Sequence, residues 1–109
     1  MSETRRLVWW TAAAEGDLAE LVTFVAAGSV PGARKLLSRL RQRAASLELM
    51  SERGRIVPEL AAFGIRSYRE LIVKPYRLVY RVTGEDVVVL ALFDSRRDLD
   101  DLLLDRLLR

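Results

Sequence analysis

Arginines inside strand-like runs are the residues of this sequence whose types and spacing could do chemistry. Three apolar runs follow one another between Tyr68 and Asp98, and arginines lie within or directly after them: Arg69, Arg77, Arg81, Arg96 and Arg97. Burying a guanidinium without a partner is costly. We therefore expect these arginines either to pair with carboxylates or to line a groove that receives an anion or an acidic partner.

A two-residue turn at Lys74-Pro75 would decide which face of the sheet carries the arginines. Such a turn places Glu70 opposite Val79, and side chains alternate between the two faces of a strand. Glu70, Arg77 and Arg81 then share one face, together with Val79. The expected members of the opposite, helix-packed face are Leu71, Val73, Tyr76, Leu78, Tyr80 and Val82.

A second turn at Gly84-Glu85 extends the arginine-bearing face onto the next strand. This face then also receives Val88, Leu90, Leu92 and Asp94. Two interpretations stay open here. The charged residues Glu70, Arg77, Arg81 and Asp94 form either a solvated ion-pair network or a functional site.

The order of elements predicts an α+β fold. Hydrophobic spacing and turn residues indicate a strand at Arg6–Trp10, an antiparallel helical hairpin over Thr11–Ser51, an extended piece at Arg55–Val57, three strands at Tyr68–Val73, Tyr76–Thr83 and Asp86–Asp94, and a C-terminal helix at Leu99–Leu108. We expect the hairpin to pack on one face of a curved antiparallel sheet, with the other face partly open, in a single domain spanning residues 1–109.

Composition narrows the chemistry. The chain has no cysteine and no histidine, so neither disulfides nor the commonest metal ligand and general base are present, and we expect no metal or other cofactor. The formal net charge of +3 is a modest basic excess. No secretory signal or apolar run long enough to span a membrane is visible, which predicts a cytoplasmic protein without membrane contact. The basic second helix is typical of a solvated face, with Arg34, Lys35, Arg39, Arg41 and Arg43.

Several motifs, taken in order, resemble the RelE/ParE superfamily of toxins from type II toxin–antitoxin systems, also called plasmid stabilisation proteins. The resemblance covers nearly the whole chain, and its motifs are Val8-Trp9, Gly54–Glu59, Tyr68–Leu71, Pro75–Tyr80, Val87–Leu92 and Arg96–Asp98. It implies a helical hairpin against a curved sheet, a role in growth inhibition, and a cognate antitoxin that forms a hetero-oligomer with the toxin and blocks its working surface.

The superfamily divides by target, and the basic positions bear on the division. RelE-like members cleave mRNA on the ribosome, whereas ParE-like members inhibit DNA gyrase. Arg77 matches the arginine that RelE-like enzymes place on the scissile phosphate, Arg96 or Arg97 matches a later basic position, and Arg69 matches one on the preceding strand. RelE-like enzymes usually add a lysine where this chain has Leu71.

The residues that would move protons in a nuclease are missing. Cleavage through a ribose 2′-hydroxyl needs a base and an acid, and arginine holds its proton too firmly to serve as either. No tyrosine follows Tyr80, and Glu70 beside arginines favours an ionised structural role. We therefore expect a ParE-like gyrase inhibitor. The alternatives are a RelE-like endoribonuclease, for which Arg77, Arg96, Arg97, Arg69 and Glu70 are the candidate catalytic residues, and a toxin that binds antitoxin but poisons nothing.

Overall fold

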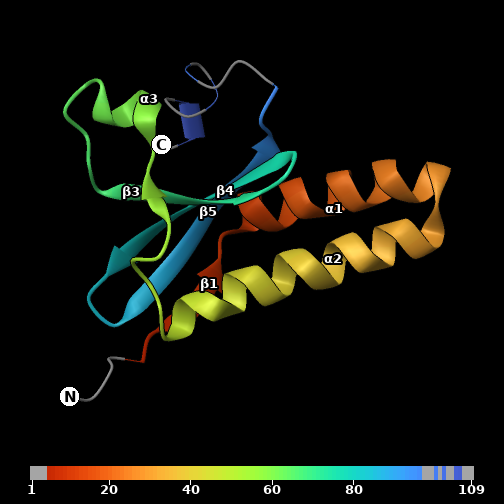
Figure 1. The fold of residues 1–109 in the computed structure, drawn as a ribbon, viewed down its shortest axis with the longest axis horizontal. Coiled ribbons are helices and arrows are strands. Elements are labelled where there is room, and N and C mark those ends of the chain that lie inside the picture. The colour runs from red at the N-terminus through yellow and green to blue at the C-terminus, as the bar shows by residue number, and fades with distance from the viewer. Residues whose placement is uncertain (1–4, 97–99, 101, 103–104, 107–109) are drawn as a thin grey trace.

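A mixed five-stranded sheet with a helical hairpin on one face forms the body of the protein (Figure 1). The computed structural model describes residues 5–96, 100, 102 and 105–106. Its elements are β1 (Leu7–Trp10), α1 (Ala12–Gly28), α2 (Val30–Ala45), the short 3₁₀ helix η1 (Ser46–Glu48), β2 (Arg55–Ile56), α3 (Pro58–Ala61), β3 (Tyr68–Val73), β4 (Tyr76–Thr83) and β5 (Asp86–Asp94). The predicted α+β fold is confirmed.

Local capping residues set the ends of the hairpin helices. The hydroxyl of Thr11 accepts a hydrogen bond of 3.0 Å from the Ala14 amide, and that of Ser29 accepts one of 3.0 Å from the Gly32 amide. Pro31 lies in the first turn of α2, where its missing N–H costs nothing. Ser29 therefore caps both the end of α1 and the start of α2, and this short connection holds the two helices antiparallel.

The strand order is β1-β5-β4-β3-β2. Neighbouring strands are antiparallel except β1 and β5, which run parallel. The predicted two-residue turns are confirmed, because Val73 pairs with Tyr76 across one turn and Thr83 with Asp86 across the other. Strands β3, β4 and β5 have the predicted bounds. The register between β3 and β4 therefore places Glu70 opposite Val79, as expected.

A bulge on β5 corrects one part of the predicted pairing. Tyr80 pairs with Val89, but Val79 pairs with Ala91, so Leu90 is an extra residue. The extra residue reverses the faces of the later side chains. Leu92 and Asp94 were expected on the arginine-bearing face; Leu92 instead joins the helix-packed core, and Asp94 pairs with Tyr76 on the same side.

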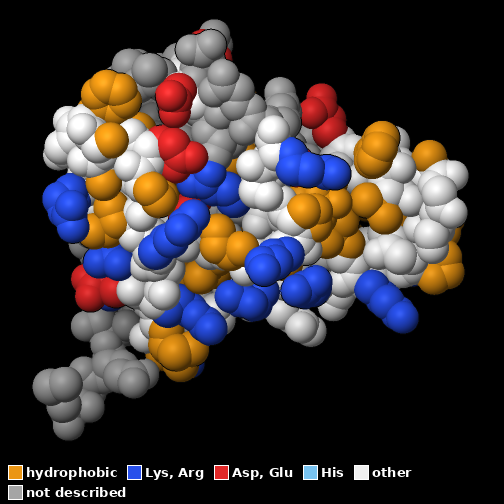
Figure 2. Space-filling view, turned by 45° about the horizontal axis from the view of Figure 1, so that its top comes forward, with side chains coloured by type: hydrophobic (Ala, Val, Ile, Leu, Met, Phe, Trp, Pro, Cys, Tyr) orange, Lys and Arg blue, Asp and Glu red, His pale blue; other side chains and the backbone are white. Residues whose placement is uncertain are grey.

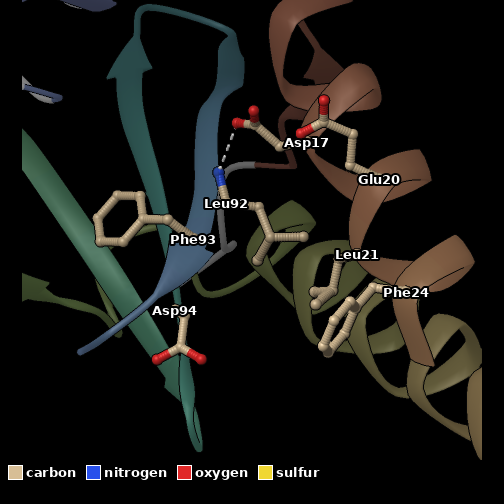
Figure 3. A pocket seen from close by; sticks show the side chains of 7 residues that line it. All are labelled: Asp17, Glu20, Leu21, Phe24, Leu92, Phe93 and Asp94. Atoms are coloured by element: carbon tan, nitrogen blue, oxygen red, sulfur yellow. Dashed lines mark hydrogen bonds between the residues drawn. The ribbon is translucent and has the colours of Figure 1, made fainter. Parts of the chain in front are cut away.

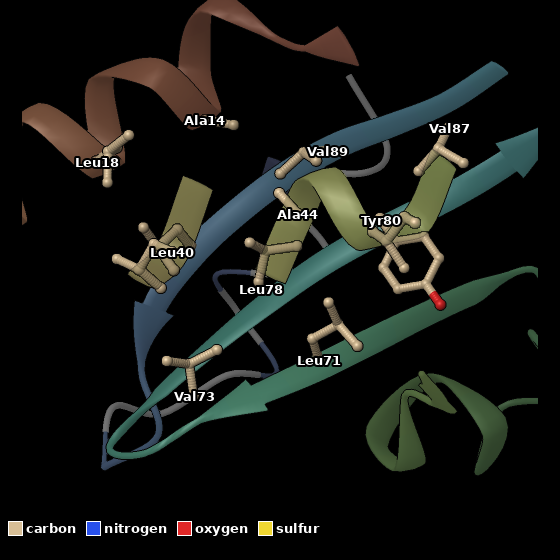
Figure 4. Packing of buried hydrophobic residues seen from close by; sticks show 12 residues of the cluster. Ala14, Leu18, Leu40, Ala44, Leu71, Val73, Leu78, Tyr80, Val87 and Val89 are labelled. Atoms are coloured by element: carbon tan, nitrogen blue, oxygen red, sulfur yellow. The ribbon is translucent and has the colours of Figure 1, made fainter. Parts of the chain in front are cut away.

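Two clusters of buried side chains lie on opposite faces of the sheet. The larger one packs between the hairpin and the sheet (Figure 4), and its buried members are Ala14, Leu18, Leu40, Ala44, Leu47, Leu71, Val73, Leu78, Tyr80, Val87, Val89 and Leu92. The smaller one consists of Val57, Leu60, Val79, Ala91 and Phe93. Segment α3 covers this second face, which the sequence predicted to be partly open; beyond α3, side chains at the far end of β4 are still partly exposed.

The predicted C-terminal helix Leu99–Leu108 falls mostly outside the described residues. The four described positions within that range, residues 100, 102, 105 and 106, have helical backbone. Leu102 packs against the smaller cluster, and Arg106 binds the carboxylate of Asp17 in α1 at 2.7 Å. In the part of the chain that the structure describes, every helix is too short or too polar to cross a membrane.

Candidate functional site

The arginine-bearing face holds a closed cluster of two arginines and two glutamates. The Nε atom of Arg77 donates to one carboxylate oxygen of Glu70 at 2.5 Å, and the Nε atom of Arg55 donates to the other at 2.6 Å. The two terminal nitrogens of Arg77 bind both oxygens of Glu59, at 2.7 and 2.8 Å. We call these four residues the Glu70–Arg77 cluster. Each of the three nitrogens of the Arg77 guanidinium therefore donates to a carboxylate oxygen.

Segment α3 is what buries this cluster. Pro58 starts the short helix and brings Glu59 into its first turn, over β4. Leu60 of the same segment fills the smaller hydrophobic cluster, and the Arg77 guanidinium lies 5.5 Å from the centre of the Phe93 ring. Glu70 is 1% exposed and Arg77 5% exposed. The pair at the centre of the cluster, Glu70 and Arg77, is therefore buried, while the side chains of Glu59 and Arg55 reach the surface.

The pKa values of Arg77 and Glu59 keep these two groups charged. Burial by itself would lower the pKa of Arg77, but the hydrogen bonds to Glu59 and Glu70 outweigh it and raise that pKa above its ordinary value. The hydrogen bonds from Arg77 hold the pKa of Glu59 below its usual value of 4.5. A group that exchanges protons near neutral pH is what general acid–base catalysis needs. Neither of these two residues meets that requirement.

The other predicted basic residues lie apart from the cluster. Arg81 shares the face but lies 5.9 Å from the centre of the Tyr68 ring, and its Nε is buried without a hydrogen-bond partner. Arg69 donates to the carbonyl oxygen of Gly54 at 2.8 Å and takes no part in the cluster. Arg96 is exposed and pairs with Asp94. Arg97 lies outside the described residues, so its predicted place stays a prediction.

Sequence reasoning missed two of the four cluster residues. Arg55 reaches Glu70 because β2 pairs with β3 and places these two residues directly opposite each other. The extended piece at Arg55–Val57 was predicted, but its strand neighbour was not. Glu59 was missed because no helix was predicted in the segment that begins at Pro58. A proline followed by an acidic residue is also a signal for a first helical turn, and that signal could have found it.

The helical hairpin offers an open groove between α1 and α2. It encloses about 330 Å³ and is lined by Glu15, Leu18, Ala19, Val22, Thr23, Leu37 and Arg41. Its floor is apolar, and one end is closed by a bidentate ion pair in which Arg41 binds Glu15 at 2.7 and 3.1 Å. Such a groove fits the apolar side of an extended or helical peptide.

A second hollow, of about 400 Å³, lies between α1 and the end of β5 (Figure 3). The figure shows Leu92 pointing toward α1 and Phe93 pointing to the other side of the sheet, as the bulge requires. Two of the carboxylates at its rim already hold arginines, since Asp17 binds Arg106 and Asp94 binds Arg96. The hollow therefore has a polar rim without a free pair of acids for catalysis.

The outer edge of the sheet is an apolar surface. β1 is the terminal strand, and its Leu7 and Trp9 side chains are 61% and 56% exposed. Leu49 and Met50 follow η1, which contacts the start of the same strand through the Arg6 amide and the Glu48 carbonyl oxygen, and both are about half-exposed. An edge strand with exposed apolar side chains is a template for strand addition by a partner.

Comparisons with known proteins agree on one family and one fold. The chain matches the family model described as the ParE toxin of the type II toxin–antitoxin system, parDE, over residues 8–99. Among solved structures it is similar to a chain of the chromosomal ParDE TA system from P. aeruginosa, with a TM-score of 0.69 and 19% identity, covering 84% of this chain and 97% of that chain. At this identity the likeness shows a shared fold. A comparison with curated proteins gave no match.

Proposed function

We propose, starting from the fact that this chain belongs to the ParE toxin family of type II toxin–antitoxin systems, that it arrests growth by binding and inhibiting DNA gyrase in the cytoplasm. The toxin role and the existence of a cognate antitoxin follow from the family. The gyrase target is our proposal, and it rests on the ParE-like character of the chain together with a site that is unsuited to RNA cleavage.

The occupied guanidinium of Arg77 is the observation that carries this choice. RelE-like enzymes use the matching arginine on a phosphate, which requires free N–H donors that point at the substrate. Here Glu70 and Glu59 take those donors, and the side chain is 7% exposed. A phosphate would have to displace a bidentate carboxylate from a buried site, at the cost of leaving that carboxylate unpaired.

The neighbouring positions support the same conclusion. Leu71, which stands where RelE-like enzymes carry a lysine, is buried in the core under the hairpin. The chain has no histidine, and Glu59 is held in its ionised form by Arg77. A protein that inhibits by binding needs no general acid or base, because its binding free energy comes from surface contacts with its target.

The direct test uses the purified chain in two assays side by side. We expect stoichiometric inhibition of DNA supercoiling by gyrase, and a DNA-damage response in cells that express the chain without antitoxin. Ribosome-bound mRNA should stay intact. Cleavage of mRNA by the wild-type chain, with supercoiling unaffected, would instead establish the endoribonuclease alternative. Normal growth with strong expression and no antitoxin would indicate a toxin that poisons nothing.

The surfaces open to the antitoxin are the hairpin groove and the outer edge of β1. The groove offers an apolar floor, and α2, which forms one of its walls, carries five cations and no carboxylate, which favours an acidic amphipathic segment. The backbone N–H and C=O groups of Val8 and Trp10 point away from β5. The residues at alternate positions point toward it, as the hydrogen bonds from the Leu7 and Thr11 amides to β5 and the turn before it show. A strand of the antitoxin can pair with them.

Hydrogen exchange of the toxin–antitoxin complex tests this arrangement. We expect added protection of the amides in β1 and along α1 and α2, with little change at Glu59 and its neighbours. A matched pair of variants sharpens the test: Val22→Asp places a charge in the groove, whereas Glu20→Gln changes a residue outside it. Protection confined to residues 99–108, or equal antitoxin affinity for both variants, would contradict the proposal.

A further inference from the structure

A row of positive side chains follows the flank of α2 that faces away from α1. Lys35, Arg39 and Arg43 recur every four residues, so they lie along one side of the helix. Arg53 extends the row, because its guanidinium binds the Ser46 hydroxyl just beyond the end of α2, at 3.0 Å. We call these four residues the basic stripe. Figure 2 shows Lys and Arg side chains, in blue, gathered along the hairpin.

Among the residues that the structure describes, no carboxylate neutralises the basic stripe. Helix α2 contains no Asp or Glu. Arg41, on the flank toward α1, is the helix cation that does have a partner, and that partner is Glu15. Within the described residues, no carboxylate lies at ion-pair distance from any member of the stripe. Like charges four residues apart destabilise a helix, so the stripe does not exist for the stability of α2.

The side chains around the stripe indicate which class of partner it fits. A protein interface is built on a buried apolar centre with charges at its rim. Among the described residues, no exposed large hydrophobic side chain lies on α2 between Lys35 and Arg43. The half-exposed Leu49 and Met50 lie next to Arg53, at the end of the stripe beside β1. The apolar groove lies on the other flank of α2. A row of solvated cations without apolar anchors is instead what binds a phosphate backbone.

The form of the nucleic acid follows from what accompanies the cations. Single-stranded chains are held by aromatic side chains on which the bases stack. Helix α2 contains no aromatic residue, and the ring of Trp10 is covered by the guanidinium of Arg41, which lies 4.6 Å from its centre. A straight helix can lie along the wide groove of B-form DNA, while the major groove of double-stranded RNA is too narrow to admit one.

We propose that the basic stripe of α2 binds the phosphate backbone of double-stranded DNA without regard to sequence. This site is separate from the groove and sheet edge available to the antitoxin, and from the Glu70–Arg77 cluster. It would add positive charge to any assembly of this chain on DNA. It does not depend on which target the toxin poisons.

Salt-dependent binding of the full chain to a short duplex DNA of arbitrary sequence tests the proposal. Each phosphate contact adds about 0.9 to the slope of log affinity against log salt concentration. The double variant Lys35→Gln, Arg39→Gln should therefore lower that slope by about two and weaken binding at low salt by about tenfold or more. Arg43 is left unchanged because its Nε is buried against the fold.

The matched control is Arg66→Gln, Lys74→Gln, which removes the same charge from exposed positions far along the chain from α2. Its slope and affinity should equal those of the wild type, and both variants should melt at the wild-type temperature. Equal loss in both variants would reduce the effect to net charge and overturn the proposal. Preference for double-stranded RNA, or equally tight and equally Lys35-dependent binding of polyglutamate, would also overturn it, the latter by showing a docking face for acidic protein.

Discussion

Replacing Arg77 with alanine separates a structural arginine from a catalytic one. In the structure the Arg77 guanidinium binds Glu70 and Glu59 together and lies over Phe93. The substitution removes one of the four charges of the cluster, and the charge that it removes is buried. Its effect depends on what the two glutamates can do once that cation is gone.

The two glutamates differ in access to water. The Glu59 side chain is 27% exposed and can be hydrated without Arg77. The Glu70 side chain has no exposed surface, so it must rely on Arg55, whose own side chain is 57% exposed. Breaking a buried ion pair costs about 3–5 kcal/mol, and the surviving bond to Arg55 puts this case near the lower value.

A loss of about 3 kcal/mol should leave a folded protein, because domains of this kind are stable by about 5–15 kcal/mol. For a domain of this size it corresponds to a melting temperature lower by about 10–20 °C. Urea denaturation of Arg77→Ala against wild type measures it. The exposed control Arg66→Ala should change stability by less than about 0.5 kcal/mol.

A double-mutant cycle with Glu70→Ala tests the mechanism behind the number. The second substitution removes the carboxylate that Arg77→Ala leaves unpaired. The double variant should therefore cost less than the sum of the single variants, by about 1 kcal/mol or more. Arg77→Ala with wild-type stability but without toxicity would refute the reasoning. That outcome would place Arg77 in direct contact with a substrate.

Two further predictions concern backbone space and pH. Gly54→Ala should prevent stable folding, because a Cβ there would lie 2.6 Å from the carbonyl oxygen of Glu70; Gly16→Ala, where no atom lies within 4 Å, should raise stability by about 0.5–1 kcal/mol. Similar denaturation curves for these two variants would contradict the packing described for β2 and β3. Because hydrogen bonds from Arg77 hold the folded-state pKa of Glu59 below 4.5, its contribution to stability is complete above that pH and is lost as the pH falls through the lower, folded value. Stability measured against pH should decline across that acidic range, and Glu59→Gln should flatten the decline; an unchanged profile would show that the pair contributes nothing.

Strand limits and turns were predictable because they depend on local signals. Lys74-Pro75 and Gly84-Glu85 interrupt long apolar runs, and each places one strand directly opposite the next. The register of β3 against β4 followed from the first turn alone. The placement of Glu70 and Arg77 on one face was therefore available from the sequence.

The bulge on β5 was not predictable for the opposite reason. Val87–Phe93 is apolar at every position, and both faces of the sheet are covered here by hydrophobic clusters. When both faces are buried, alternation no longer distinguishes them, so a shift of one residue leaves no mark in the pattern. Helix α3 was not predicted for a related reason, because its four residues are too few to show helical periodicity.

The distribution of charge shows which surface of the protein is positively charged. The Glu70–Arg77 cluster contains two cations and two anions, so its net charge is zero, and its central pair, Glu70 and Arg77, is buried. Helix α2 carries five positive charges and no negative one. The net charge of the whole chain is +3, so the residues outside α2 have a net charge of −2. The position that a nuclease uses for phosphate has thus become part of the core, and the positive field of the molecule lies on the hairpin. Under our two proposals, an acidic antitoxin segment in the hairpin groove would be attracted by that field, and the opposite flank of α2 would stay open to DNA.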